Sequence, residues 1–346
     1  MNNIVIELLS LYHLDVSSNK LEKTNISLKK ETITNYIDSL IEEILDSPNK
    51  RLYLFKDGST EVKNSVSKII TKAEDHDRVL LNNAKRLLEK EVKTDKKLQK
   101  TLGIKVQRGS LMQIHFKQGK SDNLLICKVE HDEILNEKSF EINRGLNTKK
   151  KVYKSFLYYL PNENRQGEIY VNDKNESKYW WDDFLELDQV KTDEYNTEES
   201  IDKIITAISS TTRKREFEFD NTILRNSVVG YYRNNKQFNF SDLIESVFEN
   251  YTPIRDKYPL GRVKNKLDKL IEDDTFDNQF TIVPNKIKKR KKQTIKVGPG
   301  LVLKIEEFVN NLETVFKVYD KAGEHGMIIL TDEAYNYVRG NVRKDN

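Results

Sequence analysis

The sequence predicts an α+β protein: a mixed N-terminal domain of helices and β-hairpins, then a helical segment and a small C-terminal β region. Short apolar runs such as residues 111–116 and 124–129 are typical of strands, and they are separated by a Gln118-Gly119-Lys120 turn. Apolar residues three and four positions apart over 33–44 and 201–208 are typical of amphipathic helices. The length of 346 residues suits two domains.

The N-terminal half is expected to alternate between strands and helices. A strand over residues 4–14 has a hairpin partner in 21–28, and a helix over 33–44 ends at Pro48. A short strand over 51–55 is followed by two helices with lysine-bearing outer faces, over 62–73 and 79–92. Two hairpins follow, over 111–116 with 124–129 and over 153–160 with 168–171.

A domain boundary is expected near residue 190. The segment 182–199 carries eight carboxylates against one lysine, Lys191, and its centre lacks a periodic apolar face. Thr197 resembles a helix N-cap, because two glutamates follow it. We therefore predict an α+β domain over 1–190 for dimerisation or partner contacts, and a basic helical and β domain over 197–346. In that second domain, residues 201–270 read as helical, and strands are expected at 280–283, 301–305, 315–319 and 327–330, before a short helix from 331.

Overall charge says little about partners, because 59 basic side chains are nearly balanced by 55 acidic ones. The single cysteine, Cys127, excludes an intramolecular disulfide and fits the reducing cytoplasm. No run of apolar residues is long enough to predict a membrane span.

The densest local signal is basic. Seven of the eleven residues from 286 to 296 carry positive charge: Lys286, Lys288, Lys289, Arg290, Lys291, Lys292 and Lys296. Such a cluster suits the phosphodiester backbone, whose condensed counterions are released when a protein binds. A solvated loop, an acidic protein or an anionic lipid surface are the alternative readings.

Two further basic sets fall on expected helices of the same half. One contains Arg213 and Arg215, and the other contains Arg262, Lys266 and Lys269, which share a helix face at spacings of three and four. Concentration of three basic sets after an acidic boundary favours a DNA-facing C-terminal domain. Ordinary solvated helix faces would have the same composition.

Both tryptophans, Trp180 and Trp181, are adjacent. Neighbouring side chains face one core only where the backbone bends, so one of them is a candidate contact for a protein partner or a second subunit. Packing between domains is the alternative.

Enzyme signatures are largely missing. The sequence has no P-loop, no glycine-rich dinucleotide turn, no HExxH pair and no GxSxG elbow, so we expect no cofactor and no metal. A metal-dependent nuclease is the enzyme to weigh, because Asp122, Lys128 and Glu130 bracket one strand. Ile126 occupies the position where such strands usually carry a carboxylate, and this counts against a nuclease.

The order of several short motifs resembles a known family. These motifs are Leu11-Tyr12-His13-Leu14-Asp15, Phe55-Lys56-Asp57, Arg108-Gly109-Ser110-Leu111, Lys151-Val152-Tyr153-Lys154, the run from Tyr179 to Leu185, and Gly298-Pro299-Gly300 before a strand. Together they resemble the 37-kDa nucleoid-associated protein family of bacteria (NdpA/YejK-like) over nearly the whole chain. The long basic run and the incomplete glycine turn depart from that pattern.

The resemblance implies a dimeric, non-catalytic DNA-binding protein of the nucleoid. With the basic sets, it predicts largely sequence-independent binding of double-stranded DNA in the cytoplasm by a homodimer, with no membrane attachment. A DNA-sensing component or metal-dependent nuclease effector of a phage-defence system is the first alternative. A protein–protein adaptor acting through Trp180 and Trp181 is the second.

Overall fold

The computed structural model describes residues 4–73, 75–106, 108–135, 137, 140–146, 152–163, 166–173, 177–212, 215–287, 292–321 and 323–341. Side chains at 130, 132–135, 142–144, 152, 153, 215, 340 and 341 fall outside this description. A large antiparallel sheet and many helices make the fold α+β, which confirms the predicted class. Contacts between residues divide the chain into two units, Met1–Lys191 and Thr192–Asn346.

The N-terminal unit is built on a nine-stranded sheet of order β2-β1-β4-β5-β7-β8-β3-β9, with β6 paired to β5. The strands are β1 (Ile4–Asp15), β2 (Lys20–Thr24), β3 (Arg51–Phe55), β4 (Gly109–Gln118), β5 (Ser121–Leu135), β6 (Ile142–Leu146), β7 (Val152–Tyr159), β8 (Glu168–Asp173) and β9 (Leu187–Gln189). Neighbouring strands run antiparallel throughout this sheet. The two hairpins expected from the sequence correspond to β4–β5 and β7–β8.

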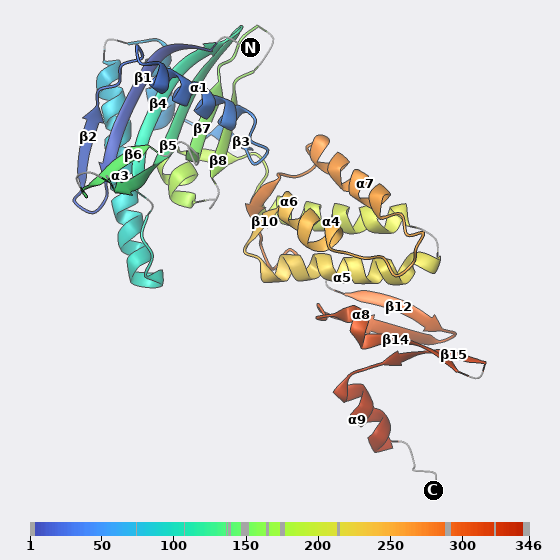
Figure 1. Ribbon diagram of the computed structural model, residues 1–346. Helices are drawn as coiled ribbons and strands as arrows, with labels where there is room; N and C mark the ends of the chain where they lie inside the picture. Colours follow the sequence, from blue (N-terminus) through green and yellow to red (C-terminus); the bar gives the residue numbers. More distant parts are fainter. Residues whose placement is uncertain are drawn as a thin grey trace. The chain divides into compact units, whose positions relative to one another are not determined.

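Helices cover both faces of the sheet (Figure 1). Because side chains alternate along a strand, Leu124 and Ile126 of β5 pack in one core while Leu125 and Cys127 pack in another. The first core also contains α2 (Glu61–Ile70) and α3 (His76–Leu102), and the second contains α1 (Glu31–Leu45). Continuous apolar runs in β4 and β5 therefore mark strands that are covered on both sides.

Helix α3 is longer than the sequence predicts. It runs ten residues past the expected end at residue 92 and stops at Gly103, whose φ is 68°. Its second half projects beyond the sheet (Figure 1). Asp95 accepts a hydrogen bond of 2.7 Å from the Val106 amide, and this bond directs the chain back towards β4. The projecting turns carry few apolar residues, so periodicity alone does not extend the helix there.

The C-terminal unit begins with a helical layer. Its helices are α4 (Asp193–Thr211), α5 (Glu218–Asn234), α6 (Phe240–Leu243) and α7 (Leu260–Glu272), and β10 (Gln237–Asn239) pairs with β11 (Gln279–Thr281). Phe238 and Phe280 stack at 4.5 Å within a core that includes Ile204. Thr192, not Thr197, caps α4, and Thr197 lies buried inside the first turns of the helix.

Two hairpins follow the helical layer. β12 (Gln293–Gly298) pairs with β13 (Leu301–Ile305), and β14 (Phe316–Lys321) pairs with β15 (Glu324–Ile329). Helix α8 (Leu312–Val315) and helix α9 (Asp332–Asn341) flank the second hairpin. A small core forms around Ile305, Leu312 and Phe316, whereas every residue of β15 is exposed.

Candidate nucleic-acid interface

Helix α7 presents the first part of the basic surface. Val263 and Leu267 are buried, and α7 packs on α4, so the remaining face points to solvent. Arg262, Lys266 and Lys269 are exposed on it, as the spacing predicts. Within the described residues none of these three cations forms an ion pair with a carboxylate. Lys266 donates to Ser210 Oγ at 2.5 Å, so its ammonium lies at the C-terminal end of α4.

Strand β12 presents the second part. Lys296 on the strand and Lys292 just before it are exposed, and Lys296 lines a pocket of about 460 Å³ formed with α4 and α5. Arg225 of α5 also lines this pocket and donates to the Lys292 carbonyl at 2.8 Å. Its Nε is buried without a hydrogen-bond partner in the described part of the chain, and burial lowers the pKa of its guanidinium. The other polar groups of the pocket include Ser209, Thr294 and one carboxylate, Glu218.

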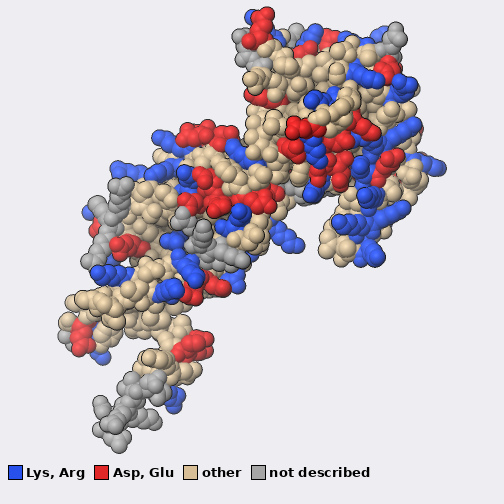
Figure 2. All heavy atoms as spheres, turned by 180° about the vertical axis from the view of Figure 1, so that it is seen from behind, with Lys and Arg blue, Asp and Glu red and all other residues tan. Residues whose placement is uncertain are grey.

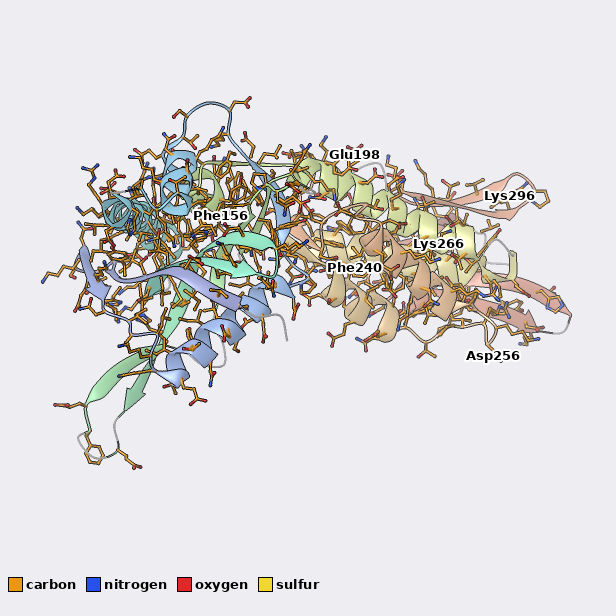
Figure 3. All side chains as sticks on the ribbon, turned by 90° about the horizontal axis from the view of Figure 1, so that it is seen from above. Phe156, Glu198, Phe240, Asp256, Lys266 and Lys296 are labelled. Carbon is orange, nitrogen blue, oxygen red and sulfur yellow. The ribbon has the colours of Figure 1, made fainter. Side chains whose placement is uncertain are left out.

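Both parts of the basic surface, on α7 and at β12, belong to the C-terminal unit. Figure 3 shows the labelled side chains of Lys266 on α7 and Lys296 on β12, with Glu198 on α4. Ser209 lines the Arg225 pocket and its neighbour Ser210 binds Lys266, so the end of α4 connects the two basic groups. Guanidinium, ammonium and hydroxyl donors in this arrangement are the groups that bind phosphate oxygens in nucleic-acid complexes.

The remaining predicted DNA contacts divide into two groups. Lys286 is partly neutralised, because its Nζ lies 3.6 Å from Glu198 Oε2. Lys288, Lys289, Arg290, Lys291 and Arg213 lie outside the described residues, and so does the side chain of Arg215.

The tryptophan pair does not form a shared surface. A π-helical turn over Tyr179–Phe184 bends the backbone, and Trp180 is fully buried with its ring 5.2 Å from that of Phe184. A side chain with no exposed surface offers nothing to a partner in this conformation, so of the two tryptophans Trp180 is the one that faces the core. Trp181 is half-buried and packs 5.7 Å from Tyr53, so its role as a partner contact stays a prediction.

The residues proposed for a nuclease do not gather in the described structure. Lys128 is 1% exposed and its Nζ lies 2.5 Å from Glu91 Oε1, inside the unit beneath α3. Asp122 binds His115 Nε2 at 2.7 Å, and the side chain of Glu130 falls outside the described set. Within the described residues no group of three histidine, cysteine, aspartate or glutamate side chains could hold a metal ion.

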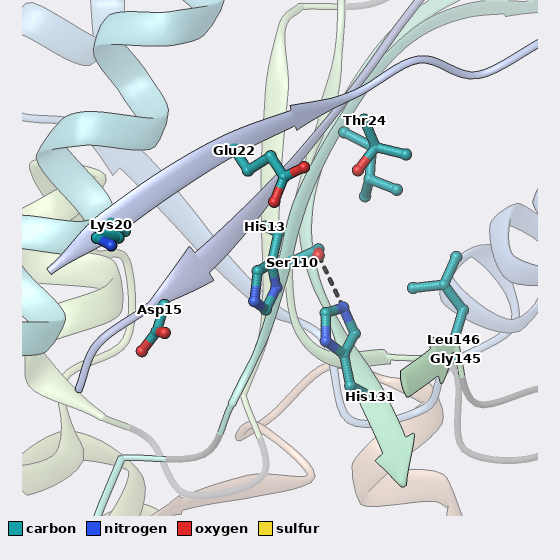
Figure 4. A pocket seen from close by; sticks show the side chains of 10 residues that line it. His13, Asp15, Lys20, Glu22, Thr24, Ser110, His131, Gly145 and Leu146 are labelled. Atoms are coloured by element: carbon teal, nitrogen blue, oxygen red, sulfur yellow. Dashed lines mark hydrogen bonds between the residues drawn. The ribbon is translucent and has the colours of Figure 1, made fainter. Parts of the chain in front are cut away.

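A second polar cavity, of about 550 Å³, opens at one end of the sheet (Figure 4). His13 and His131 stack there at 4.9 Å, and Ser110 Oγ lies 2.7 Å from His131 Nε2. A serine next to a histidine is half of a nucleophile arrangement. Ser110 is only 2% exposed, however, which favours a structural hydrogen bond between β4 and β5 over attack on a substrate.

Sequence reasoning missed how far one basic feature extends, because the lysine-bearing face expected over 79–92 continues into the projecting half of α3. Lys90, Lys93 and Lys97 recur at spacings of three and four, so the signal was present in the sequence. Figure 2 shows lysine and arginine side chains gathered on this end of the helix. The helix therefore carries a second basic surface, in the N-terminal unit.

No protein-family model matches the chain, and no curated protein is significantly similar to it. The resemblance to nucleoid-associated proteins therefore stays a prediction. None of the helices in the described ranges is long and apolar enough to cross a bilayer.

Proposed function

We propose that this protein binds double-stranded DNA through the basic surface of its C-terminal unit, largely without sequence preference and without catalysis. The observation that carries the proposal is the row Arg262, Lys266 and Lys269, which is exposed and has no carboxylate partner among the described residues. Lys296 and the Arg225 pocket add further donors in the same unit. Cations that are not neutralised by the protein itself can neutralise phosphates and release counterions.

The first experiment measures duplex affinity at several salt concentrations. Arg262→Gln with Lys269→Gln should weaken binding to every duplex tested and reduce the slope of log affinity against log salt by about 0.9 for each phosphate that is no longer neutralised. The matched control is Lys203→Gln with Lys264→Gln. These lysines already pair with Glu199 at 3.2 Å and Glu249 at 3.3 Å in the same unit, so the slope should stay unchanged.

Equal loss of slope in both double variants would mean that net charge, not this surface, drives binding. An unchanged affinity in the Arg262 and Lys269 variant would remove α7 from the interface. Both comparisons need equal thermal stability of the variants, which the exposure of Arg262 and Lys269 and the partial exposure of Lys203 and Lys264 favour.

The second experiment tests the dense basic run of the sequence. Replacing Lys288, Lys289, Arg290, Lys291 and Lys292 with Ala should weaken binding across all sequences and flatten the salt dependence. If affinity and salt dependence both survive this change, the dense basic run is not a DNA contact.

The third experiment tests the absence of catalysis. Duplex recovered after incubation with Mg²⁺ should remain intact on a gel. Cut DNA would favour the nuclease effector instead, and the residues responsible would have to lie elsewhere than the buried Lys128.

The proposal includes a homodimer held by the N-terminal unit and action on the nucleoid in the cytoplasm. Sedimentation at several protein concentrations should show a dimer. Trp181→Ala should weaken that dimer, or the capture of a protein partner, if the half-buried indole lies at the contact.

A further inference from the structure

A groove of about 580 Å³ lies in the N-terminal unit, between the projecting half of α3 and the turn that begins at Ser177. The two walls are packed against each other, because α3 contacts the π-helical turn Tyr179–Phe184. The volume falls in the range of small-molecule sites, which run from about 300 to 1,000 Å³. The groove shares no lining residue with the proposed DNA surface.

One wall of the groove is strongly basic. Lys90, Lys93 and Lys97 line it from one face of α3, and none of them pairs with a carboxylate within the described residues. Two acids of this stretch are engaged elsewhere, because Glu91 binds Lys128 in the interior and Asp95 accepts the Val106 amide. A third, Glu89, is exposed and does not line the groove. The groove therefore concentrates positive charge that the protein does not neutralise.

The groove also has an apolar floor. Leu98 and Leu102 of α3 line it, together with the ring of Tyr179 from the opposite wall. Leu102 is 67% exposed, which is a large apolar surface for the charged end of a helix. Apolar and aromatic surface of this kind binds the flat rings of ligands, whereas contact with the phosphate backbone alone needs only donors.

A buried polar network holds the wall opposite α3. Lys154 donates to Asp173 at 2.5 Å and to Ser177 Oγ at 2.7 Å, and the Ser177 amide donates to Asp173 Oδ2 at 2.7 Å. Tyr179 is held from both sides, since its hydroxyl donates to Glu91 Oε1 of α3 at 3.4 Å and its ring lies 5.3 Å from Lys154 Nζ. Ser177 and Tyr179 are thus positioned before any ligand enters, which lowers the entropic cost of binding.

The same wall contributes one carboxylate and one further lysine. Lys178 lies 3.5 Å from Asp182, so its charge is partly compensated. Asp183 lines the groove and is exposed. A carboxylate in a basic groove repels phosphate but accepts hydrogen bonds from hydroxyl or amino groups, so it favours a ligand that carries both kinds of group.

We propose that this groove binds a nucleotide. The phosphates lie on Lys93 and Lys97, and the base packs against the apolar floor of Leu98, Leu102 and Tyr179. Asp183 accepts a hydrogen bond from the ribose or the base. Each part of such a ligand meets a matching group: anionic oxygens meet ammonium donors, and the ring meets apolar surface. A ligand in this groove would bind the unit that does not carry the proposed DNA surface.

Isothermal titration of the full-length protein with adenosine triphosphate tests the proposal. Lys93→Gln with Lys97→Gln should weaken binding at least about tenfold, because two charge-assisted hydrogen bonds are removed. Lys96→Gln with Lys100→Gln is the matched control: the same helix loses the same charge at exposed positions that do not line the groove. Its effect should stay below about threefold, since solvent and salt screen distant charges.

A third variant separates a nucleotide from a simple anion. Leu102→Ser should weaken the binding of adenosine triphosphate by about three- to tenfold and leave the binding of inorganic triphosphate unchanged. Equal affinity for the two probes would overturn the proposal, because the apolar floor would then contribute nothing. Three other results would also overturn the proposal. The two lysine double variants could lose equal affinity, or the protein could bind single-stranded oligonucleotide or polyglutamate in place of adenosine triphosphate. The third result is no binding of adenosine triphosphate at all. Duplex affinity of the same variants, measured in parallel, tests the DNA proposal separately.

Discussion

The buried ion pair between Glu91 and Lys128 gives the sharpest test of the N-terminal unit. Glu91 is 0% and Lys128 is 1% exposed, and their charged atoms are 2.5 Å apart. With an effective dielectric constant near 20, this separation corresponds to roughly 7 kcal/mol of attraction. Desolvation of two ions offsets most of that gain, so the pair is worth little compared with two apolar residues.

Removal of one partner should therefore cost much more than removal of both. Lys128→Met leaves Glu91 in the interior with a weak hydrogen bond of 3.4 Å from Tyr179 and one carboxylate oxygen without a partner among the described residues. We expect a loss of about 3–5 kcal/mol in the free energy of unfolding. The double variant Glu91→Leu with Lys128→Met should lie within about 1 kcal/mol of the wild type, or above it.

Urea unfolding followed by tryptophan fluorescence measures these differences in the relevant unit, because both tryptophans lie within residues 1–191. The result that refutes the reasoning is additivity: a double variant that loses the sum of the two single losses would show that the two side chains do not interact. A Lys128→Met loss below about 1 kcal/mol would show that the interior hydrates the pair.

Three further predictions address other parts of the chain. Burial lowers the pKa of Lys154 to about 8 from 10.5, so the folded state binds fewer protons than the unfolded state between these values. The free energy of unfolding of the wild type should thus rise with pH across that window by about 3 kcal/mol relative to that of Lys154→Met. Urea titrations from pH 7 to 11 measure both proteins, and an equal pH dependence of their free energies of unfolding would contradict the prediction. Gly230→Ala should lower the free energy of unfolding by about 1–3 kcal/mol, because its new methyl group would lie 2.5 Å from the Phe308 ring. The control is Gly261→Ala, whose methyl group meets open space and should not destabilise the protein. Thermal unfolding followed by circular dichroism compares the two variants. Thr192→Ala should cost about 1 kcal/mol in the same assay by removing the cap of α4, and Thr192→Asp should restore it.

Much of the fold could be predicted from the sequence because its strands and helices carry strong local periodicity. The hairpin of β4 and β5 follows from two apolar runs around Gly119, whose φ is 61°. The burial of Lys128 could not be predicted, since a lysine in an apolar strand gains its partner, Glu91, only from a helix 37 positions earlier. The burial of Trp180 escapes prediction for a related reason, because the π-helical turn that sends it inward has no sequence signature.

The candidate sites could be predicted only in part. Exposure of Arg262, Lys266 and Lys269 follows from helix periodicity alone. The role of Arg225 could not be predicted, because its pocket is completed by β12, a strand about 70 positions away that lies next to the dense basic run. The groove beside α3 depends on the length of that helix and on a turn far along the chain, and neither is encoded by local pattern.

The position of β3 in the sheet has a consequence for how the protein is made. This strand spans residues 51–55, yet its two neighbours are β8 and β9, which end at residues 173 and 189. During synthesis, β3 leaves the ribosome well before either neighbour has been made. Its backbone amides therefore have no strand to pair with while more than a hundred further residues are added. Pairing of such distant segments is slow and leaves apolar strands open to wrong partners. A chain interrupted anywhere before residue 187 would lack the edge strand β9, and we expect such a fragment to need chaperones or to aggregate.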